Sequence, residues 1–239
     1  MSGARASRRE VARLVDVLQL PVGARILDCP CGQGRHAALL ASAGYRVDGL
    51  DYSRHLLQVA RGTGGRRRDA PRYRVGDMRS LPAAWTGRFD AVVNLSTSFG
   101  FFRLPQDDMR VLGEFARVLV DGGTLVWHGA SRDGVMARLI SRDWWPTSDG
   151  ALLGHRRHVD LLSGILTVES EWRGRAGEGR RTYQIRLYTA TRLAELMADV
   201  GLIVEEAFGG WTDRPLTRRV GEMLLVARKR ELPRARRLR

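Results

Sequence analysis

The chain has 239 residues, a length that suits one domain with an insertion and that allows a sizeable hydrophobic core. Its formal net charge is +14, from 40 Lys and Arg residues against 26 Asp and Glu residues. No apolar run approaches the roughly 18 residues that cross a membrane, and the N-terminus lacks the apolar segment of a signal peptide. The composition therefore predicts a cytoplasmic protein with no membrane partner.

Part of the positive charge lies at the end of the chain, where Arg228 to Arg239 hold seven basic groups and one acid, and the rest is spread along the sequence. Lys229 is the only lysine, and such nearly exclusive use of arginine indicates a coding bias, because selection for phosphate contacts would also favour lysine. The runs Arg66–Arg68 and Arg234–Arg237 have no interleaved aromatic residues to stack on single-stranded nucleic acid. We expect a solvated loop and a basic tail at 230–239, and nucleic acid is not favoured as a partner.

Strand and helix patterns alternate through the first half of the chain. The first helix carries its apolar face at Val11, Leu14, Val15 and Leu18, after a capping box formed by Ser7 and Glu10. The strands expected next are Ile26–Asp28, Arg46–Asp51, Tyr73–Val75, Arg88–Leu95 and Thr124–His128. The helices between them are His36–Ala43 before Gly44, Ser53–Ala60 before a loop at Gly62–Arg68, and a helix with Leu112, Phe115, Ala116 and Leu119 on its apolar face, closed by Asp121-Gly-Gly123. This alternation predicts an α/β fold with a doubly wound, mostly parallel sheet.

The pattern changes after the fifth strand. From Leu152 to Thr189 the residues alternate with a period of two, and turn signals at Ser163-Gly164 and Gly174–Gly179 separate the runs, which predicts a small antiparallel sheet. A helix with Leu193, Leu196, Met197 and Val200 on one face and strands near Leu202–Phe208 and Glu222–Ala227 then complete a seven-stranded core. We expect residues 1–130 and 190–229 to form the core and residues 131–189 to form a β-rich lid at the acceptor site.

A glycine-rich turn joins the first buried strand to its helix, in the run Asp28-Cys-Pro-Cys-Gly-Gln-Gly34. Gly32 and Gly34 supply a positive φ and no Cβ, so backbone N–H groups at a helix N-terminus can approach a ligand. The glycine spacing also fits a dinucleotide site, but the negative charge of Asp28 would face the pyrophosphate there and would suit a ligand that carries an ammonium and a sulfonium. Asp51, at the end of the second strand, is placed to accept two ribose hydroxyls.

The acid, the glycines and the second acid together resemble motif I of the class I S-adenosylmethionine (SAM) methyltransferases, in particular the small-molecule and aminosugar N-methyltransferases. The resemblance is strong at Leu27–His36, Gly76–Met78 and Phe89–Gly100. It implies SAM as cofactor and S-adenosylhomocysteine (SAH) as its product. The residues that it places on the cofactor are Asp28 and the backbone at Cys31, Gly32 and Gly34 on the methionyl group, Arg35 on its carboxylate, Asp51 on the ribose, Tyr52 and Met78 around the adenine, Asp77 on the adenine amino group, and Asn94 and Leu95 beside the sulfonium.

The acceptor side is less well defined by the sequence. His128 ends the fifth strand and is a candidate general base, since imidazole side chains exchange protons near neutral pH, although methyl transfer from a sulfonium needs no base for many acceptors. Candidate walls of the acceptor pocket are Phe99, Phe101, Trp144, Trp145, Arg186 and Tyr188. No metal site is expected, because Cys29 and Cys31 have a spacing that matches no common zinc motif and strains a disulfide.

The function predicted from the sequence is methyl transfer from SAM to an O or N atom of a small-molecule acceptor, by a monomer or homodimer. The loop Asn94-Leu-Ser-Thr-Ser-Phe99 lacks the Asn/Asp-Pro-Pro-aromatic signature that resembles methyltransferases of bases and glutamine. Three alternatives stay open at this point: an RNA methyltransferase that uses the arginine-rich tail, an NAD-dependent Rossmann enzyme, and a SAM-binding protein without catalysis.

Overall fold

The computed structural model describes residues 3–63, 69–147, 150–175 and 177–230. The predicted basic runs at Arg66–Arg68 and Arg234–Arg237 lie outside these residues. The helices are α1 (Ala4–Leu18), α2 (Arg35–Ser42), α3 (Arg54–Thr63), the 3-10 helix η1 (Ala83–Trp85), α4 (Pro105–Val118), α5 (Arg132–Ala137) and α6 (Ala190–Asp199). The strands of the main sheet are β1 (Arg25–Asp28), β2 (Arg46–Asp51), β3 (Arg72–Val75), β4 (Phe89–Asn94), β5 (Leu119–Ala130), β10 (Leu202–Phe208) and β11 (Glu222–Lys229).

These seven strands form one sheet in the order β10-β11-β5-β4-β1-β2-β3. Only β11 runs antiparallel to its neighbours, β5 and β10, among the described strands of this sheet. The order reverses between β1 and β4, so the loops that follow these two strands diverge at the carboxyl edge, where ligands bind in open α/β sheets. The predicted doubly wound, mostly parallel seven-stranded sheet is confirmed.

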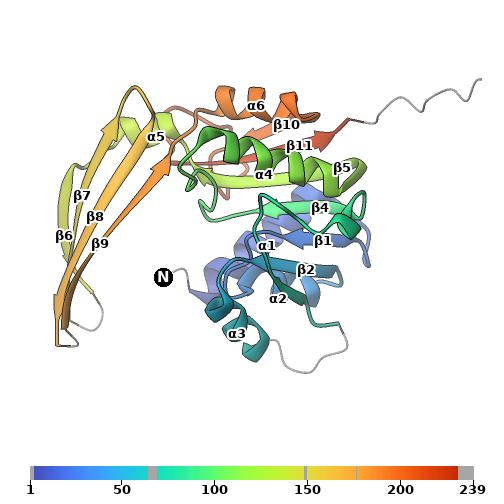
Figure 1. The fold of residues 1–239 in the computed structure, drawn as a ribbon, viewed down its shortest axis with the longest axis horizontal. Coiled ribbons are helices and arrows are strands. Elements are labelled where there is room, and N and C mark those ends of the chain that lie inside the picture. Colours follow the sequence, from blue (N-terminus) through green and yellow to red (C-terminus); the bar gives the residue numbers. More distant parts are fainter. Residues whose placement is uncertain (1–2, 64–68, 148–149, 176, 231–239) are drawn as a thin grey trace, which may run out of the picture.

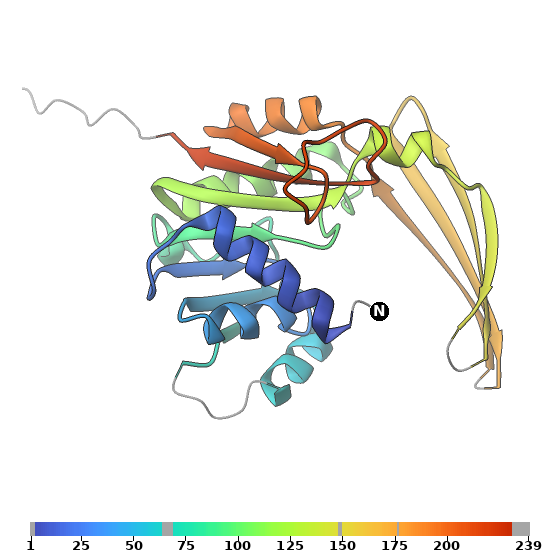
Figure 2. The same ribbon diagram turned by 180° about the vertical axis from the view of Figure 1, so that it is seen from behind.

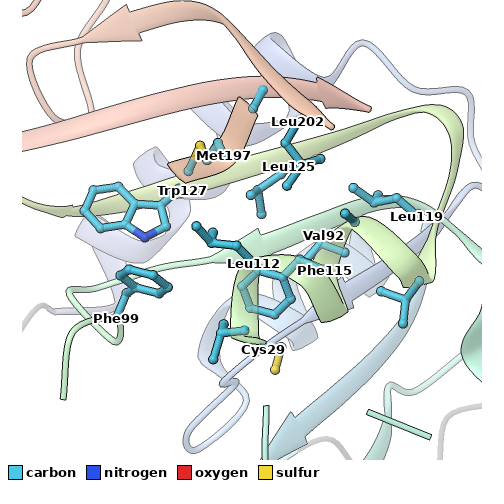
Figure 3. Close-up of a cluster of buried hydrophobic side chains, with 14 of the residues drawn as sticks. Cys29, Val92, Phe99, Leu112, Phe115, Leu119, Leu125, Trp127, Met197 and Leu202 are labelled. Carbon is cyan, nitrogen blue, oxygen red and sulfur yellow. The ribbon is translucent and has the colours of Figure 1, made fainter. Parts of the chain in front are cut away.

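Buried apolar residues cover both faces of the main sheet. On one face, α4 and α6 pack through Leu112, Phe115 and Met197 against the strands; Figure 3 shows part of this cluster, including Phe99 and Trp127. On the other face, α1 and α2 pack through residues such as Leu14 and Leu40. The strands between them are buried on both sides, as their nearly continuous apolar sequences require.

A second sheet of four antiparallel strands, which we call the arm, lies between α5 and α6 in the sequence. Its strands are β6 (Arg142–Pro146), β7 (Leu152–Asp160), β8 (Ile165–Gly174) and β9 (Gly177–Arg186), in the order β6-β7-β8-β9. Both ribbon views show the arm set apart from the main sheet, opposite the carboxyl ends of its parallel strands (Figures 1 and 2). At its root, Val159, Leu166 and Ile185 pack against the segment that leads from β5 into α5.

Several local predictions were wrong. The capping box is absent: α1 begins at Ala4, Ser7 is buried inside the helix, and Glu10 turns away to bond His36. The helix α4 ends at Val118, and Asp121–Gly123 belong to β5 as a bulge in which β5 advances from position 119 to 124 while β4 advances from 89 to 91. The antiparallel sheet begins earlier than the predicted Leu152, because the candidate pocket walls Trp144 and Trp145 lie on a further edge strand, β6. The loop expected at Gly62–Arg68 does not begin at Gly62, because α3 continues through Thr63, and residues 64–68 lie outside the described residues.

No helix among the described residues is both long enough and apolar enough to cross a lipid bilayer.

Candidate functional site

The glycine-rich turn between β1 and α2 forms the centre of the carboxyl edge. Gly32 and Gly34 both adopt the left-handed conformation, with φ of 55° and 74°. The two glycines serve different purposes. A Cβ on Gly32 would meet nothing within 4 Å, so its side faces open space, whereas a Cβ on Gly34 would lie 2.3 Å from the hydroxyl of Tyr73. The turn is therefore open to a ligand at Gly32 and packed against the protein at Gly34.

Two cysteines flank this turn as reduced, buried residues, as the sequence predicted. Cys29 and Cys31 form no disulfide. Burial raises the pKa of both thiols, and the negative charge of Asp28 raises them further, so the thiols stay protonated. The backbone N–H of Cys31 donates to the carbonyl of Leu50, which ties the turn to β2.

Two buried polar atoms at the ends of adjacent strands have no hydrogen-bond partner. Oδ2 of Asp28, at the end of β1, and Oδ1 of Asn94, at the end of β4, are both unpaired. The amide nitrogen of Asn94 donates to the carbonyl of Cys29 at 2.8 Å, which holds this side chain against the start of the glycine turn. Burial is the main reason that the pKa of Asp28 is raised to about 8, and the nearby Asp51 raises it further. A buried acceptor without a donor is costly, so these two atoms indicate a missing hydrogen-bond donor such as an ammonium group.

Asp51 and Tyr52 lie next to the glycine turn at the end of β2. The carboxylate of Asp51 accepts the backbone N–H of Gly32 at 2.7 Å and that of Ser53 at 2.8 Å. Each oxygen keeps a free lone pair, so the carboxylate can still accept a hydroxyl. Tyr52 is 83% exposed, so its ring can meet a planar ligand.

Asp77 is already engaged by a neighbour that sequence reasoning missed. Arg79 donates from Nε and Nη2 to both oxygens of Asp77, at 2.7–3.1 Å, and from its backbone N–H at 2.8 Å. These bonds lower the pKa of Asp77 and occupy most of its lone pairs. Met78 is half-buried and packs against the main core, so only part of its side chain is available to an adenine ring.

Arg35 and His36 meet Glu10 of α1 at the first turn of α2. His36 Nε2 lies 2.7 Å from Glu10 Oε2, and Arg35 Nη2 lies 3.8 Å from the same oxygen. Burial lowers the pKa of His36, although Glu10 acts in the opposite direction. Glu10 therefore links the N-terminal helix to the start of α2, and Arg35, which is partly exposed, remains a candidate for the cofactor carboxylate.

His128 is buried on the face of the sheet that α1 and α2 cover. Its Nδ1 accepts the backbone N–H of Ser96 at a long 3.4 Å, and its Nε2 lies 3.4 Å from Glu222 Oε2 without hydrogen-bond geometry. The indole of Trp211, from the loop between β10 and β11, lies against the imidazole with ring centroids 4.4 Å apart. In this conformation both ring nitrogens face protein groups, so His128 needs a local rearrangement before it can act as a base.

The loop after β4 has the strain expected of a binding loop. Ser96 and Thr97 both have positive φ, near 59° and 58°, which is rare for residues with a side chain. Thr97 is held there by donating its N–H to the carbonyl of His128. Leu95 is buried beneath this loop. The backbone at Asn94 and Leu95 thus lies at the carboxyl edge, where the sequence placed it beside the sulfonium.

Three predicted acceptor residues are structural parts of the protein. Phe99 is 2% exposed and packs on Trp127 and Tyr188 in the main core (Figure 3). Arg186 and Tyr188 both bond Oδ2 of the buried Asp108, at 2.8 and 2.7 Å. Their polar groups are engaged by this contact, and both residues also line a pocket at the root of the arm, together with Leu161, Ser163 and Thr189.

The fourth predicted acceptor residue, Trp144, lies on the outer face of the arm. Strand pairing places Trp144 with Gly154 on one face, and the indole covers that glycine. The opposite, inner face carries Tyr183, whose ring contacts Phe101 of the loop after β4, with centroids 6.2 Å apart. Pairing across the four strands puts the following residues on the inner face: Trp145, Leu153, His155, Arg157, Trp172 and Arg181. Trp145 is therefore better placed than Trp144 to face an acceptor.

The chemistry of this edge fits SAM. The unpaired oxygens of Asp28 and Asn94 would take its ammonium, the open side of Gly32 would face its methionyl chain, and Asp51 and the exposed ring of Tyr52 would meet its adenosine. At Asp77 the adenine amino group would have to share the carboxylate with Arg79.

Comparison with known proteins identifies the family. A family model described as a methyltransferase domain matches residues 26–123. The ubiquinone biosynthesis O-methyltransferase of Xanthomonas oryzae pv. oryzae is 35% identical over 179 residues, which cover 67% of this chain and 72% of that protein. The chain belongs to the class I SAM-dependent methyltransferases, enzymes whose methyl donor is SAM. This confirms the family that the motifs resemble and decides against the dinucleotide alternative. The chain spans less than half the length of other curated relatives, such as a glycine/sarcosine N-methyltransferase of Halorhodospira halochloris.

Solved structures share the whole fold, including the arm. The CcbJ methyltransferase from Streptomyces caelestis is similar with a TM-score of 0.82 at 18% identity, over 97% of this chain and 94% of that chain. An amino pentose methyltransferase from Micromonospora echinaspora, with SAM bound, has a TM-score of 0.74 at 22% identity, over 95% of this chain and 94% of that chain. At these identities the likeness concerns the fold.

Proposed function

We propose that this protein transfers the methyl group of SAM to an O or N atom of a small molecule that binds between the carboxyl edge of the main sheet and the inner face of the arm. The observation that carries the proposal is the pair of buried, unpaired oxygens on Asp28 and Asn94, beside a glycine turn that is open at Gly32. Within this enzyme family, such a pair suits the ammonium of the cofactor.

The cofactor supplies a methyl group that is already activated by the sulfonium. The work left to the protein is alignment, because an in-line displacement depends on holding the two reacting atoms close and collinear. The fixed backbone at Asn94 and Leu95 and the strained Ser96-Thr97 segment serve that purpose. For a hydroxyl acceptor a base is also needed, and His128 takes that role if Trp211 and Glu222 release it.

We further propose that residues 131–189 act as the lid over the acceptor. The inner face of the arm offers aromatic rings at Trp145, Trp172 and Tyr183, with the charged Arg157 and Arg181 between them. Such a mixture of flat apolar surfaces and a few polar groups is typical of small-molecule sites. The predicted RNA alternative depends on the basic runs outside the described residues, and nothing in the described site favours it.

The cofactor half of the proposal is tested by calorimetric titration with SAH. We expect micromolar or tighter binding by the wild type. Asp51→Ala should weaken that binding by about 1–3 kcal/mol, because two ribose hydroxyls lose their acceptor. Binding of NAD in place of SAH, or an Asp51→Ala variant that binds SAH as well as the wild type, would contradict the proposed site.

The acceptor half is tested by methyl incorporation from labelled SAM into fractionated small-molecule extracts and into bulk RNA. A small-molecule enzyme should label a low-molecular-weight product at all moderate salt concentrations. An RNA enzyme anchored by phosphate contacts should lose RNA affinity steeply with salt, with a log–log slope of about −0.7 per contact on single strands. Salt-steep binding and labelling of RNA that vanish on truncation after Lys229 would refute the small-molecule proposal.

A further inference from the structure

Two adjacent acids at the start of α4 bond residues from two different parts of the molecule, the cofactor edge and the arm. Asp107 accepts Nη1 of Arg79 at 3.0 Å, and Arg79 comes from the loop that holds the adenine-side Asp77. Asp108, the next residue, accepts Arg186 and Tyr188, which lie at the end of β9 and just after it. The first turn of α4 is therefore the point where these two parts of the molecule are joined by ion pairs.

Arg79 and Arg186 also converge on one aromatic residue between them. The guanidinium of Arg79 lies over the ring of Phe102, 4.4 Å from its centroid. Arg186 donates Nη1 to the carbonyl of Phe102 at 3.2 Å and Nη2 to the carbonyl of Arg103 at 3.0 Å. Its backbone N–H donates to the carbonyl of Gly100 at 2.8 Å, where a Cβ would lie only 2.4 Å from the carbonyl oxygen of Arg186. The loop after β4 is thus clamped between the two arginines.

Arg79 bonds two carboxylates at once, those of Asp77 and Asp107. A carboxylate offers about four lone-pair sites, and Arg79 already fills most of those on Asp77 through its Nε, its Nη2 and its backbone N–H. An adenine amino group that bonds Asp77 must displace part of this set. The guanidinium that is released still has Asp107 beside it, whose carboxylate is largely buried.

We propose that Arg79 is a positioning residue that couples the adenine site to the root of the arm: cofactor binding at Asp77 shifts Arg79 toward Asp107 and Phe102 and thereby fixes the loop after β4 and the end of β9. The inference rests on the proposed function, because it takes adenine to bind at Asp77. Its consequence is an order of events, in which the acceptor site reaches its final shape only after the cofactor is bound. Coupling between two sites of this kind is commonly about 5- to 150-fold in affinity.

Amide hydrogen exchange on the full chain, with SAH as the probe, tests this directly. The reporter amides are in residues 99–104 and 183–188, which include the N–H of Arg186 that donates to Gly100. In the wild type, SAH should slow exchange in both segments by about tenfold, since local opening there becomes rarer. In Arg79→Gln this slowing should fall below about twofold, while SAH affinity changes by less than about threefold. Arg79→Lys, which keeps the charge but cannot bridge two carboxylates in the same plane, should be intermediate.

Arg110→Gln is the matched control. Arg110 pairs with the same Asp107, at 3.0 Å from its other oxygen, but its side chain is 68% exposed and this pair lies within a single turn of α4. This variant should behave as the wild type does. Asp107→Asn removes the other partner of the Arg79–Asp107 ion pair and should reproduce the effect of Arg79→Gln. Agreement between the two variants excludes a folding defect that is peculiar to one of them.

The outcomes separate the two ideas. Equal SAH protection in the wild type and in Arg79→Gln overturns the coupling, and so does SAH binding to the wild type without any protection at the two segments. Failure of SAH to bind the wild type contradicts the proposed function instead.

Discussion

Cofactor affinity should rise with pH, because Asp28 is protonated in the free protein. Burial raises its pKa to about 8, and Oδ2 has no hydrogen-bond partner. A cationic ammonium group binds the ionised carboxylate far better than the neutral acid. Binding of SAH should therefore release one proton from Asp28 at pH values well below 8.

The size of the effect follows from the titration of one carboxyl group. With a pKa of about 8, the ionised fraction is about 1% at pH 6 and about 24% at pH 7.5, so the Kd for SAH should fall roughly 25-fold across this interval, or about 1.9 kcal/mol. The rise should level off above about pH 8, where the group is ionised before the ligand arrives.

Calorimetry in two buffers of different ionisation enthalpy measures both the affinity and the proton release. Asp28→Asn keeps the shape of the side chain but cannot titrate, so it should lose the pH dependence and bind SAH about 10- to 100-fold more weakly at pH 7.5. Asp121→Asn, an exposed acid near the start of β5 that pairs with Lys229, serves as control and should match the wild type. A flat wild-type profile, or the same slope in Asp28→Asn, would refute the reasoning.

The same carboxyl group should affect the stability of the free protein in the opposite sense. Its pKa is about 8 in the folded chain against an ordinary value of 3.8, so the folded state holds the proton more tightly than the unfolded state. The stabilising contribution of the neutral form is complete below about pH 4 and is lost as the pH rises to about 8. Urea denaturation of wild type and Asp28→Asn across this range should show a decline with pH that the variant lacks.

Two further substitutions test the packing around the site. Gly34→Ala should lower the free energy of unfolding by about 2–4 kcal/mol, because its Cβ would meet Tyr73 at a positive φ, whereas Gly32→Ala, with the same kind of φ but open space, should cost only about 1 kcal/mol; equal losses in denaturant titrations would contradict the packing role. Tyr188→Phe should cost about 1–3 kcal/mol by removing a donor from the buried Asp108, and an unchanged urea midpoint would show that this bond contributes nothing.

The cofactor edge could be predicted from sequence because its signals are local. The strand β1, the glycine turn and α2 follow each other within about twenty residues, and their hydrophobic pattern and glycine positions fix their conformation directly. The last residues of β2 and β4 then lie at the same edge, because the carboxyl ends of parallel strands meet at one edge of the sheet. Asp51 was placed in this way without any knowledge of contacts, whereas the backbone at Asn94 was placed by the resemblance to the family.

The partners of these residues were not predictable in the same way. Arg79 lies two positions after Asp77, but nothing in the sequence says that its side chain turns back rather than into solvent. Trp211 reaches His128 from more than eighty positions away, through a loop with no periodic pattern. The failed capping box has a similar cause, since Glu10 finds His36, which is 26 positions distant, in place of the local backbone.

On the acceptor side, strand register and long-range pairing decide which residues lie together, and neither can be read from the sequence. In a strand, neighbouring residues point to opposite faces, so choosing Trp144 over Trp145 amounts to choosing a face of β6, and the alternating pattern fixes which residues share a face but not which face meets the core. Arg186 and Tyr188 are two positions apart, and both bond Asp108, which lies about eighty positions earlier in the sequence. Aromatic and basic residues close in sequence to the expected acceptor site can therefore be the ones that attach the arm to the main sheet. The residues that contact the acceptor are expected on the face of the arm that carries Tyr183.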